Sequence, residues 1–517
     1  MSENIFCMKK IKLNIAFAFV LSLLILAGTS CNNFDDINTD PDKTTQVNAS
    51  MLATNIILRV TKFQGRDAKA MIQANAISKY VGYANEGQLG EQYNWLGSAG
   101  FDDMTILPNI EKMLNYAENG IMEDSYRGVA AFSKAVVFYR MTMEMGDIPY
   151  SEAGKGKDGT YRVKYDTQEE VLRGVLEELK AAEQYFAKGK PFDGDPTPYK
   201  GNPALWRRAA NAYALKVMMT LSKKESIGGI SLKRRFAETV TTGALLEANS
   251  GYWGLEYSSV NKHPLSGTND LFTSRTVPST ILVEGLKIFN DRRLYYYAEP
   301  SVKQIAAGKT QTDPDAYIGV DVEMDYAAMN ANHSNNVYSL INLRYLKEET
   351  SEPRRLMTFA EQQLILAEAV IIGWISGDAK SYYESGVKAA LADAMATKAS
   401  YAHNMPITQA YIDGYFIGEA AFKTNSAEQL EQIWMQRYFL NFLQESQSVF
   451  FDYRRTKYPE FKVNPASSMN ANDKNAIPMR WLYPGSETNY NRENLEDALK
   501  RQYDGFDEIN KLMWILK

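Results

Sequence analysis

Apolar residues recur at the spacing of an α-helix along most of the chain. One stripe has successive apolar residues four, four, three and four positions apart: Val171, Val175, Leu179, Ala182 and Phe186. This spacing places the side chains on one face of a helix. Thr167 and Glu170 have capping-box spacing before the stripe, and Gly189 and Pro191 follow it. These are signals for a helix start and a helix end, so the pattern predicts an amphipathic helix between Thr167 and Gly189.

Other segments repeat this pattern, some of them in pairs. Asn202 and Pro203 supply a cap and a first-turn proline for the helix that follows. Its large and small residues have the rhythm of a tetratricopeptide repeat: Trp206, Ala209, Ala210 and Tyr213. Residues 360–374 and 377–395 form a second candidate pair, joined by a short Ser-Gly-Asp turn. We therefore expect a mostly α fold in which tetratricopeptide-like helix hairpins stack into a platform.

Two parts of the chain lack long helical stripes. Residues 247–350 are interrupted by Gly, Pro, Asn and Ser, and a second such stretch lies around 455–495. A single core stops growing near about 250–300 residues, so a chain of 517 residues should contain sub-layers. The sequence predicts a helical platform over 49–246 and 355–460. It also predicts an irregular, loop-rich inserted subdomain over 247–350 and an irregular C-terminal segment over 461–517.

The N-terminus has the pattern of an export signal. Lys9, Lys10 and Lys12 precede thirteen residues, 15–27, in which Ser22 is the only polar side chain. A membrane-spanning helix needs about 20 apolar residues, whereas signal peptides use roughly 7–15 followed by small residues. Residues 1–30 are therefore predicted to be a signal peptide.

Cys7 and Cys31 are the only cysteines, and Cys7 leaves with the leader. A sole cysteine directly after the apolar region resembles the acylation site of bacterial lipoproteins, although Gly28 stands where Leu is usual. Several acyl chains, at about 0.8 kcal/mol per buried methylene, would hold the protein permanently at a membrane. The alternative is ordinary cleavage near Ser30 with a free thiol at Cys31.

The segment 31–48 is polar and acidic and predicts a solvated tether. Asp35 and Asp36 within it resemble the export tags of surface-exposed Bacteroidota lipoproteins. A charged linker that carries no export signal fits the composition equally well.

The overall composition is that of a folded globular chain. It has 57 Lys and Arg against 62 Asp and Glu, with 45% hydrophobic and 23% charged residues. These values exclude collagen-like, disordered and multi-spanning membrane classes. The mildly acidic balance and the lack of a long basic run argue against a nucleic-acid partner.

Motifs for a metal, a cofactor or a nucleophile are not found. His263, His333 and His403 are 70 residues apart in succession, which is no zinc-ligand spacing, and each is expected at the surface or in a loop. The GKGKDG segment at 154–159 satisfies G-x-G-x-x-G but follows no apolar strand, so it predicts a loop. We expect no metal and no cofactor.

Aromatic residues are the positive signal, with 32 Tyr and 7 Trp. The C–H faces of sugar rings pack on aromatic planes, while their hydroxyls need polar partners at the rim. One candidate cluster lies within 80–103 and the other within 252–257, and both mix the two residue types. The candidate ligand-binding residues are Tyr83, Tyr93, Trp95, Asp102, Trp253 and Tyr257. The competing interpretation is that these rings fill gaps between helices.

Five segments in chain order resemble the SusD/RagB family of outer-membrane nutrient-binding lipoproteins. They are FYRMTMEMGDIPYSEA (138–153), ALWRRAANAYALKVMM (204–219), the AE and AEA helix pair (359–391), the Gln-containing helix with its Arg-Arg-Thr segment (433–461), and IPMRWLYPGSETNYNRENLEDA (477–498). The chain departs from the family's Asp-Pro-Arg-Leu at Asp291-Arg292-Arg293-Leu294, and Phe451 stands where Trp is frequent.

The resemblance implies an α-rich fold with four tetratricopeptide-like helix pairs and a ligand site on irregular loops. It also implies a position over a SusC-like, TonB-dependent barrel transporter in the outer membrane, facing the cell exterior. Ligand-facing aromatics of the family are implied to come from loops equivalent to the 80–103 cluster.

We therefore expect a surface lipoprotein that binds an oligosaccharide or another oligomeric nutrient, delivers it to the transporter and leaves it chemically unaltered. A secreted glycan hydrolase remains an alternative, because it needs only two carboxylates roughly 5–9.5 Å apart. A helical-repeat scaffold that contacts only proteins is the third hypothesis. Exposure of Trp95 and Trp253 to solvent would favour ligand binding over the scaffold.

Overall fold

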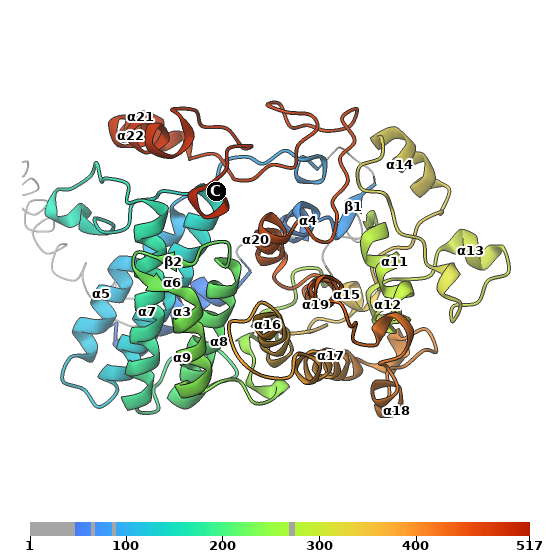
Figure 1. Cartoon of the computed structure of the whole chain (residues 1–517), viewed down its shortest axis with the longest axis horizontal. Helices are drawn as coiled ribbons and strands as arrows, with labels where there is room; N and C mark the ends of the chain where they lie inside the picture. The colour runs from blue at the N-terminus through green and yellow to red at the C-terminus, as the bar shows by residue number, and fades with distance from the viewer. Residues whose placement is uncertain (1–46, 64–67, 85–88, 268–273) are drawn as a thin grey trace, which may run out of the picture. The chain divides into compact units, whose positions relative to one another are not determined.

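The computed structural model describes residues 47–63, 68–84, 89–267 and 274–517 (Figure 1). Contacts group Ala49–Lys517 into one compact unit. The predicted signal peptide, Cys31 and the tether up to Gln46 lie outside the described residues. Within the described part, no helix is both long and apolar enough to span a bilayer.

The fold is mostly α-helical, which confirms the predicted fold class. The first half contains α3 (Ala49–Thr61), α4 (Ala68–Ile77), α5 (Ile106–Ala117), α6 (Glu123–Met145), α7 (Gln168–Lys188), α8 (Pro203–Thr220) and α9 (Leu232–Thr242). The last third contains α16 (Phe359–Ile371), α17 (Ala379–Met395), α18 (Gln409–Asp413), α19 (Ser426–Leu440), α20 (Ser446–Thr456), α21 (Gly485–Tyr490) and α22 (Arg492–Tyr503).

The helices begin where the sequence predicts. The Thr167 side chain accepts a hydrogen bond from the Glu170 N–H, and the Glu170 carboxylate accepts one from the Thr167 N–H, which completes the capping box of α7. Asn202 caps α8, with Pro203 in its first turn. Figure 1 shows α6, α7 and α8 side by side, and α16 beside α17, as expected for stacked hairpins.

Residues 247–350 are more ordered than their composition suggests. They contain α11 (Thr280–Ile288), α12 (Arg293–Tyr297), α13 (Val302–Ala306), α14 (Tyr326–Ser334) and α15 (Arg344–Lys347). Short antiparallel strands join them to the helical parts: β1 (Val81–Tyr83) with β5 (Thr276–Pro278), and β4 (Trp253–Leu255) with β6 (Arg354–Met357). A further hairpin pairs β2 (Ser226–Ile227) with β3 (Ile230–Ser231). The insert is therefore fixed to segments far away in the sequence.

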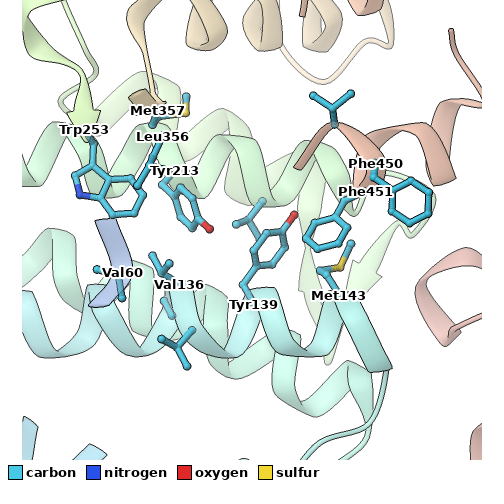
Figure 2. Packing of buried hydrophobic residues seen from close by; sticks show 14 of the residues in the cluster. Val60, Val136, Tyr139, Met143, Tyr213, Trp253, Leu356, Met357, Phe450 and Phe451 are labelled. Carbon is cyan, nitrogen blue, oxygen red and sulfur yellow. The ribbon is translucent and has the colours of Figure 1, made fainter. Parts of the chain in front are cut away.

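The core lies where α6 meets α8, α20 and the β4–β6 pair (Figure 2). Trp253 of β4 is fully buried, with its ring edge-to-face against Phe132 at 4.8 Å and Tyr213 at 5.5 Å. Such ring pairs stabilise by about 0.5–1.5 kcal/mol beyond the burial of their area. Trp253 therefore belongs to the core.

A buried network of charges joins α8, α16, α19 and α20. Its ion pairs are Arg437–Asp452 (2.5 Å), Arg437–Glu361 (3.4 Å), Arg437–Glu368 (3.4 Å), Arg455–Glu368 (2.6 Å) and Lys216–Glu361 (3.3 Å). Arg455 thus braces the fold through carboxylates. Its neighbour Arg454 does not, because it donates to the Met479 carbonyl at 2.7 Å and lies over the Phe451 ring.

His263 lies in a loop, as expected, but its side chain is buried. The Leu265 N–H donates to its Nδ1, and the rings of Tyr257 and Tyr345 pack beside it. Burial lowers the pKa of His263 to about 4, a direction that Arg344 reinforces and Glu352 opposes. The imidazole is therefore neutral in the folded protein at neutral pH.

We predict that this neutral histidine makes stability pH-dependent. Between pH 6.5 and about 4 the unfolded chain binds a proton at His263 that the folded chain does not. The contribution of His263 to the free energy of unfolding should therefore fall by about 3 kcal/mol as the pH drops through this window. Urea unfolding of the wild type and His263→Gln over this range measures the effect, and the difference between them at about pH 8 corrects for lost packing. Parallel stability curves for the two proteins would contradict the prediction.

Candidate functional site

The turn that carries Trp95 directs its indole outward. The short helix η1 (Glu91–Tyr93) ends at Asn94, whose backbone is left-handed with φ +64°. The amide groups of Tyr93 and Trp95 both donate to the Gly90 carbonyl, at 3.0 and 2.9 Å. Asn tolerates this conformation better than most residues, because its short polar side chain bonds locally. The closed turn leaves Trp95 46% exposed, an unusual position for so large a ring.

Two glycines, Gly90 and Gly97, lie directly against the Trp95 ring. A Cβ atom on Gly90 would lie 2.6 Å from Trp95 Cε3, and one on Gly97 would lie 3.2 Å from Cη2. The ring therefore rests against both glycine backbones, at distances that a side chain would obstruct. One side of the indole is held by the protein while the rest faces solvent.

A buried ion pair anchors this turn. Lys79 Nζ lies 2.5 Å from Glu323 Oε1, and both side chains are almost fully buried. The same ammonium group donates to the Gln92 carbonyl and to Asn94 Oδ1, while the Asn94 amide donates to Glu323. Burial lowers the pKa of Lys79, and Glu323 opposes that shift. The turn is therefore positioned by charge-assisted hydrogen bonds shielded from water.

Three segments far apart in the sequence meet here, namely 89–103, 321–326 and 464–482, and we call their joint surface the Trp95 platform. The connecting hydrogen bonds run from Met469 N–H to Tyr93 O (2.7 Å), from Leu482 N–H to Gly97 O (3.1 Å), and from the Asn464 amide to Glu323 O (3.1 Å). In Figure 1 the C-terminal loops run beside the early loop that contains η1.

The structure places the other predicted site residues differently. Tyr83 and Tyr93 are buried, and Tyr93 donates its hydroxyl to the Met324 carbonyl within the base of the platform. Burial raises the pKa of Tyr93, with nearby carboxylates adding to the shift. Both tyrosines support the platform and lie beneath its surface.

The second predicted cluster does not join the first. Trp253 is fully buried in the core, and Tyr257 is half-buried against His263, so neither offers a free ring face comparable to that of Trp95. Asp102 is exposed at the start of η2 (Asp102–Thr105), a few residues beyond Trp95. Trp95 and Asp102 are thus the solvent-exposed members of the predicted set.

Sequence reasoning missed the residues that build the platform. Gly90 and Gly97 flank Trp95 in LGEQYNWLG, and that flanking is the one local signal that could have indicated a supported ring. Lys79 and Glu323 are 244 positions apart, and nothing in the sequence pairs them. Among the described residues, no three His, Cys, Asp or Glu side chains gather where they could hold a metal ion.

A family model and several solved structures are similar to this chain over most of its length. A family model named SusD-like and described as "Starch-binding associating with outer membrane" matches residues 41–484. A SusD homologue from Bacteroides fragilis superposes with a TM-score of 0.87 at 37% identity, covering 91% of this chain and 100% of that chain. An outer membrane protein from Bacteroides vulgatus, linked by its name to nutrient binding, gives 0.83 at 32% identity with the same coverage.

A chitin-binding SusD homologue from Flavobacterium johnsoniae shares the fold, with a TM-score of 0.69 at 20% identity over 91% of this chain and 98% of that chain. No curated protein sequence matches.

We predict that Gly90→Ala displaces the Trp95 ring. The backbone at Gly90 has φ −55°, which alanine adopts without strain, so the new methyl group acts only through its clash with the indole. A crystal structure of the variant should show the ring lifted away from Gly97, with the fold intact. Gly100→Ala is the matched control, because its nearest neighbour would lie 3.8 Å away. An unmoved indole in Gly90→Ala would show that the glycines do not set its position.

Proposed function

The chain belongs to the SusD-like family, and on that premise we propose that it is a surface lipoprotein that binds oligosaccharides on the Trp95 platform. It delivers them to a SusC-like, TonB-dependent barrel transporter and does not change them chemically. The observation that carries this proposal is a large aromatic ring exposed to solvent yet held in place from behind.

The physical basis is the pairing of a sugar ring with an indole. A pyranose has an apolar C–H face that loses contact with water when it stacks on an aromatic plane. Because Gly90 and Gly97 hold the indole in advance, little side-chain freedom is lost on binding. Asp102 and the exposed Asp321 and Asp325 supply acceptors for hydroxyl groups near the same surface.

The exposure of Trp95 favours ligand binding over a scaffold that contacts only proteins. Trp253 gives no such support, because it is buried. The hydrolase alternative needs a free carboxylate pair beside the ligand. Glu323, the buried carboxylate at the base of the platform, is already engaged by Lys79 and Asn94. The proposal therefore assigns it a structural role.

We predict that Trp95→Ala weakens oligosaccharide binding at least tenfold, about 1.4 kcal/mol, because the stacking surface is removed. Isothermal titration of residues 32–517 with maltooligosaccharides, chitooligosaccharides and xylooligosaccharides measures it, and Gly90→Ala should lose affinity in the same direction. Tyr116→Ala is the control, since Tyr116 is also largely exposed but lies about 15 Å along α5 from the start of that helix.

Mass spectrometry of the recovered ligand completes the test. We expect the oligosaccharides unchanged after prolonged incubation. Shortened products would favour the hydrolase. Equal affinity of wild type and Trp95→Ala for every bound ligand would show that the Trp95 platform is not the oligosaccharide-binding site.

A second prediction concerns the anchor. If Cys31 carries the acyl chains, Cys31→Ser should release the exported protein from the membrane fraction, since no apolar helix in the described part can replace the anchor. Membrane fractionation and protease treatment of intact cells measure retention and exposure. Ser30→Ala, which changes the neighbouring position and keeps the thiol, is the control. Full retention of Cys31→Ser at the cell surface would contradict lipidation at this residue.

A further inference from the structure

A cavity lies away from the Trp95 platform, where α12, α16, α17 and α19 meet β6. Its volume is ≈ 130 Å³, and it shares no lining residue with segments 89–103, 321–326 or 464–482. One water needs roughly 10–15 Å³ of such space, so the cavity has room for several waters or for a small molecule in their place.

The cavity is lined by an ion pair that is not closed by a hydrogen bond. Arg355 Nε lies 3.7 Å from Asp393 Oδ2, which is too long for a hydrogen bond. This Nε is itself buried, but both side chains line the cavity and are 17% exposed, so a ligand reaches the pair through their other atoms.

Both members of the pair are held in position by their neighbours. The Arg355 backbone N–H donates to Gln444 Oε1 at 2.8 Å, and its guanidinium lies over the Tyr252 ring at 5.4 Å. The Asn249 amide donates to the Ala389 carbonyl at 2.8 Å, one helical turn before Asp393 on α17. The donor and the acceptor are therefore fixed before any ligand arrives, which lowers the entropy lost on binding.

The remaining charges of the lining are already compensated. Arg344 pairs with Glu352 at 2.7 Å, and Glu361 pairs with Lys216 and Arg437 in the buried network. With Arg355 facing Asp393, each charge in the lining has an opposite partner. A charged ligand would upset this balance, whereas a neutral ligand whose hydroxyls both donate and accept would fit it.

The other lining groups suit a ring with apolar and polar parts. Tyr297 and Phe442 contribute aromatic surface, and Thr397 contributes a hydroxyl group. Aromatic surface together with a few converging polar groups is typical of small-molecule sites.

We propose that this cavity binds one neutral sugar ring, either a free monosaccharide or the terminal unit of an oligosaccharide. Its hydroxyls bridge the guanidinium of Arg355 and the carboxylate of Asp393. The site goes beyond the oligosaccharide-binding function proposed above, because it depends on none of the residues of the Trp95 platform.

Saturation-transfer NMR on residues 32–517 with glucose, galactose and N-acetylglucosamine as probes tests the proposal. We expect millimolar binding of at least one of the three sugars. Asp393→Asn keeps the shape but removes the charge and should weaken binding about tenfold. Ala396→Trp places a large side chain on the exposed rim of the cavity and should abolish it. The control Asp413→Asn, at the exposed end of α18, should bind as the wild type does.

Trp95→Ala distinguishes this site from the platform. Monosaccharide binding should survive in Trp95→Ala, while oligosaccharide binding weakens there. The proposal is overturned if the wild type binds none of the three sugars, if Ala396→Trp binds them as well as the wild type, or if Trp95→Ala alone removes the signal. Failure of oligosaccharides to bind at the platform would leave these results unaffected, so the two proposals fail separately.

Discussion

The arrangement of the helices depends on one buried cluster of charges. Arg437 on α19 pairs with Glu361 and Glu368 on α16 and with Asp452 on α20. Lys216 on α8, in the first half of the chain, also pairs with Glu361. Removing one partner from such a cluster leaves a buried charge uncompensated, which typically costs 3–5 kcal/mol. Apolar side chains pack these helices together, and the charge pairs add partner-specific contacts between α8, α16, α19 and α20. Both kinds of contact join the first half of the helical framework to the last third.

A buried charge pair also joins distant segments beneath the Trp95 platform. The Lys79–Glu323 pair lies on segments that are distant in sequence, and it binds the turn through Gln92 and Asn94. A loop that depended on exposed hydrogen bonds alone would open readily, because such segments belong to the low-stability part of a fold. The buried pair holds the backbone of the turn through hydrogen bonds shielded from water, while the indole of Trp95 remains exposed.

Local patterns in the sequence predicted local structure well. The capping box at Thr167 and the proline of α8 set helix starts because their partners are within a few residues. The two tryptophan clusters looked alike in composition, yet Trp95 is exposed and Trp253 is buried. The difference comes from tertiary structure: β4 pairs with β6 from about a hundred positions later, and Phe132 and Tyr213 pack on the ring of Trp253, so the core encloses it. Composition shows which rings are suited to stack on a sugar, but burial determines which of these rings a ligand can reach.

The two proposed sites differ in a way that bears on the kind of ligand each can accept. At the platform the ring of Trp95 is 46% exposed, so the ligand proposed there stacks on a ring at the protein surface. The Arg355–Asp393 cavity has a volume of ≈ 130 Å³, and the ligand proposed for it is a single free or terminal ring. Affinity at an open surface grows with the number of linked units that make contact, whereas a closed site discriminates through its paired polar groups. A protein with both would hold long chains through their interior and still respond to the identity of a single sugar unit.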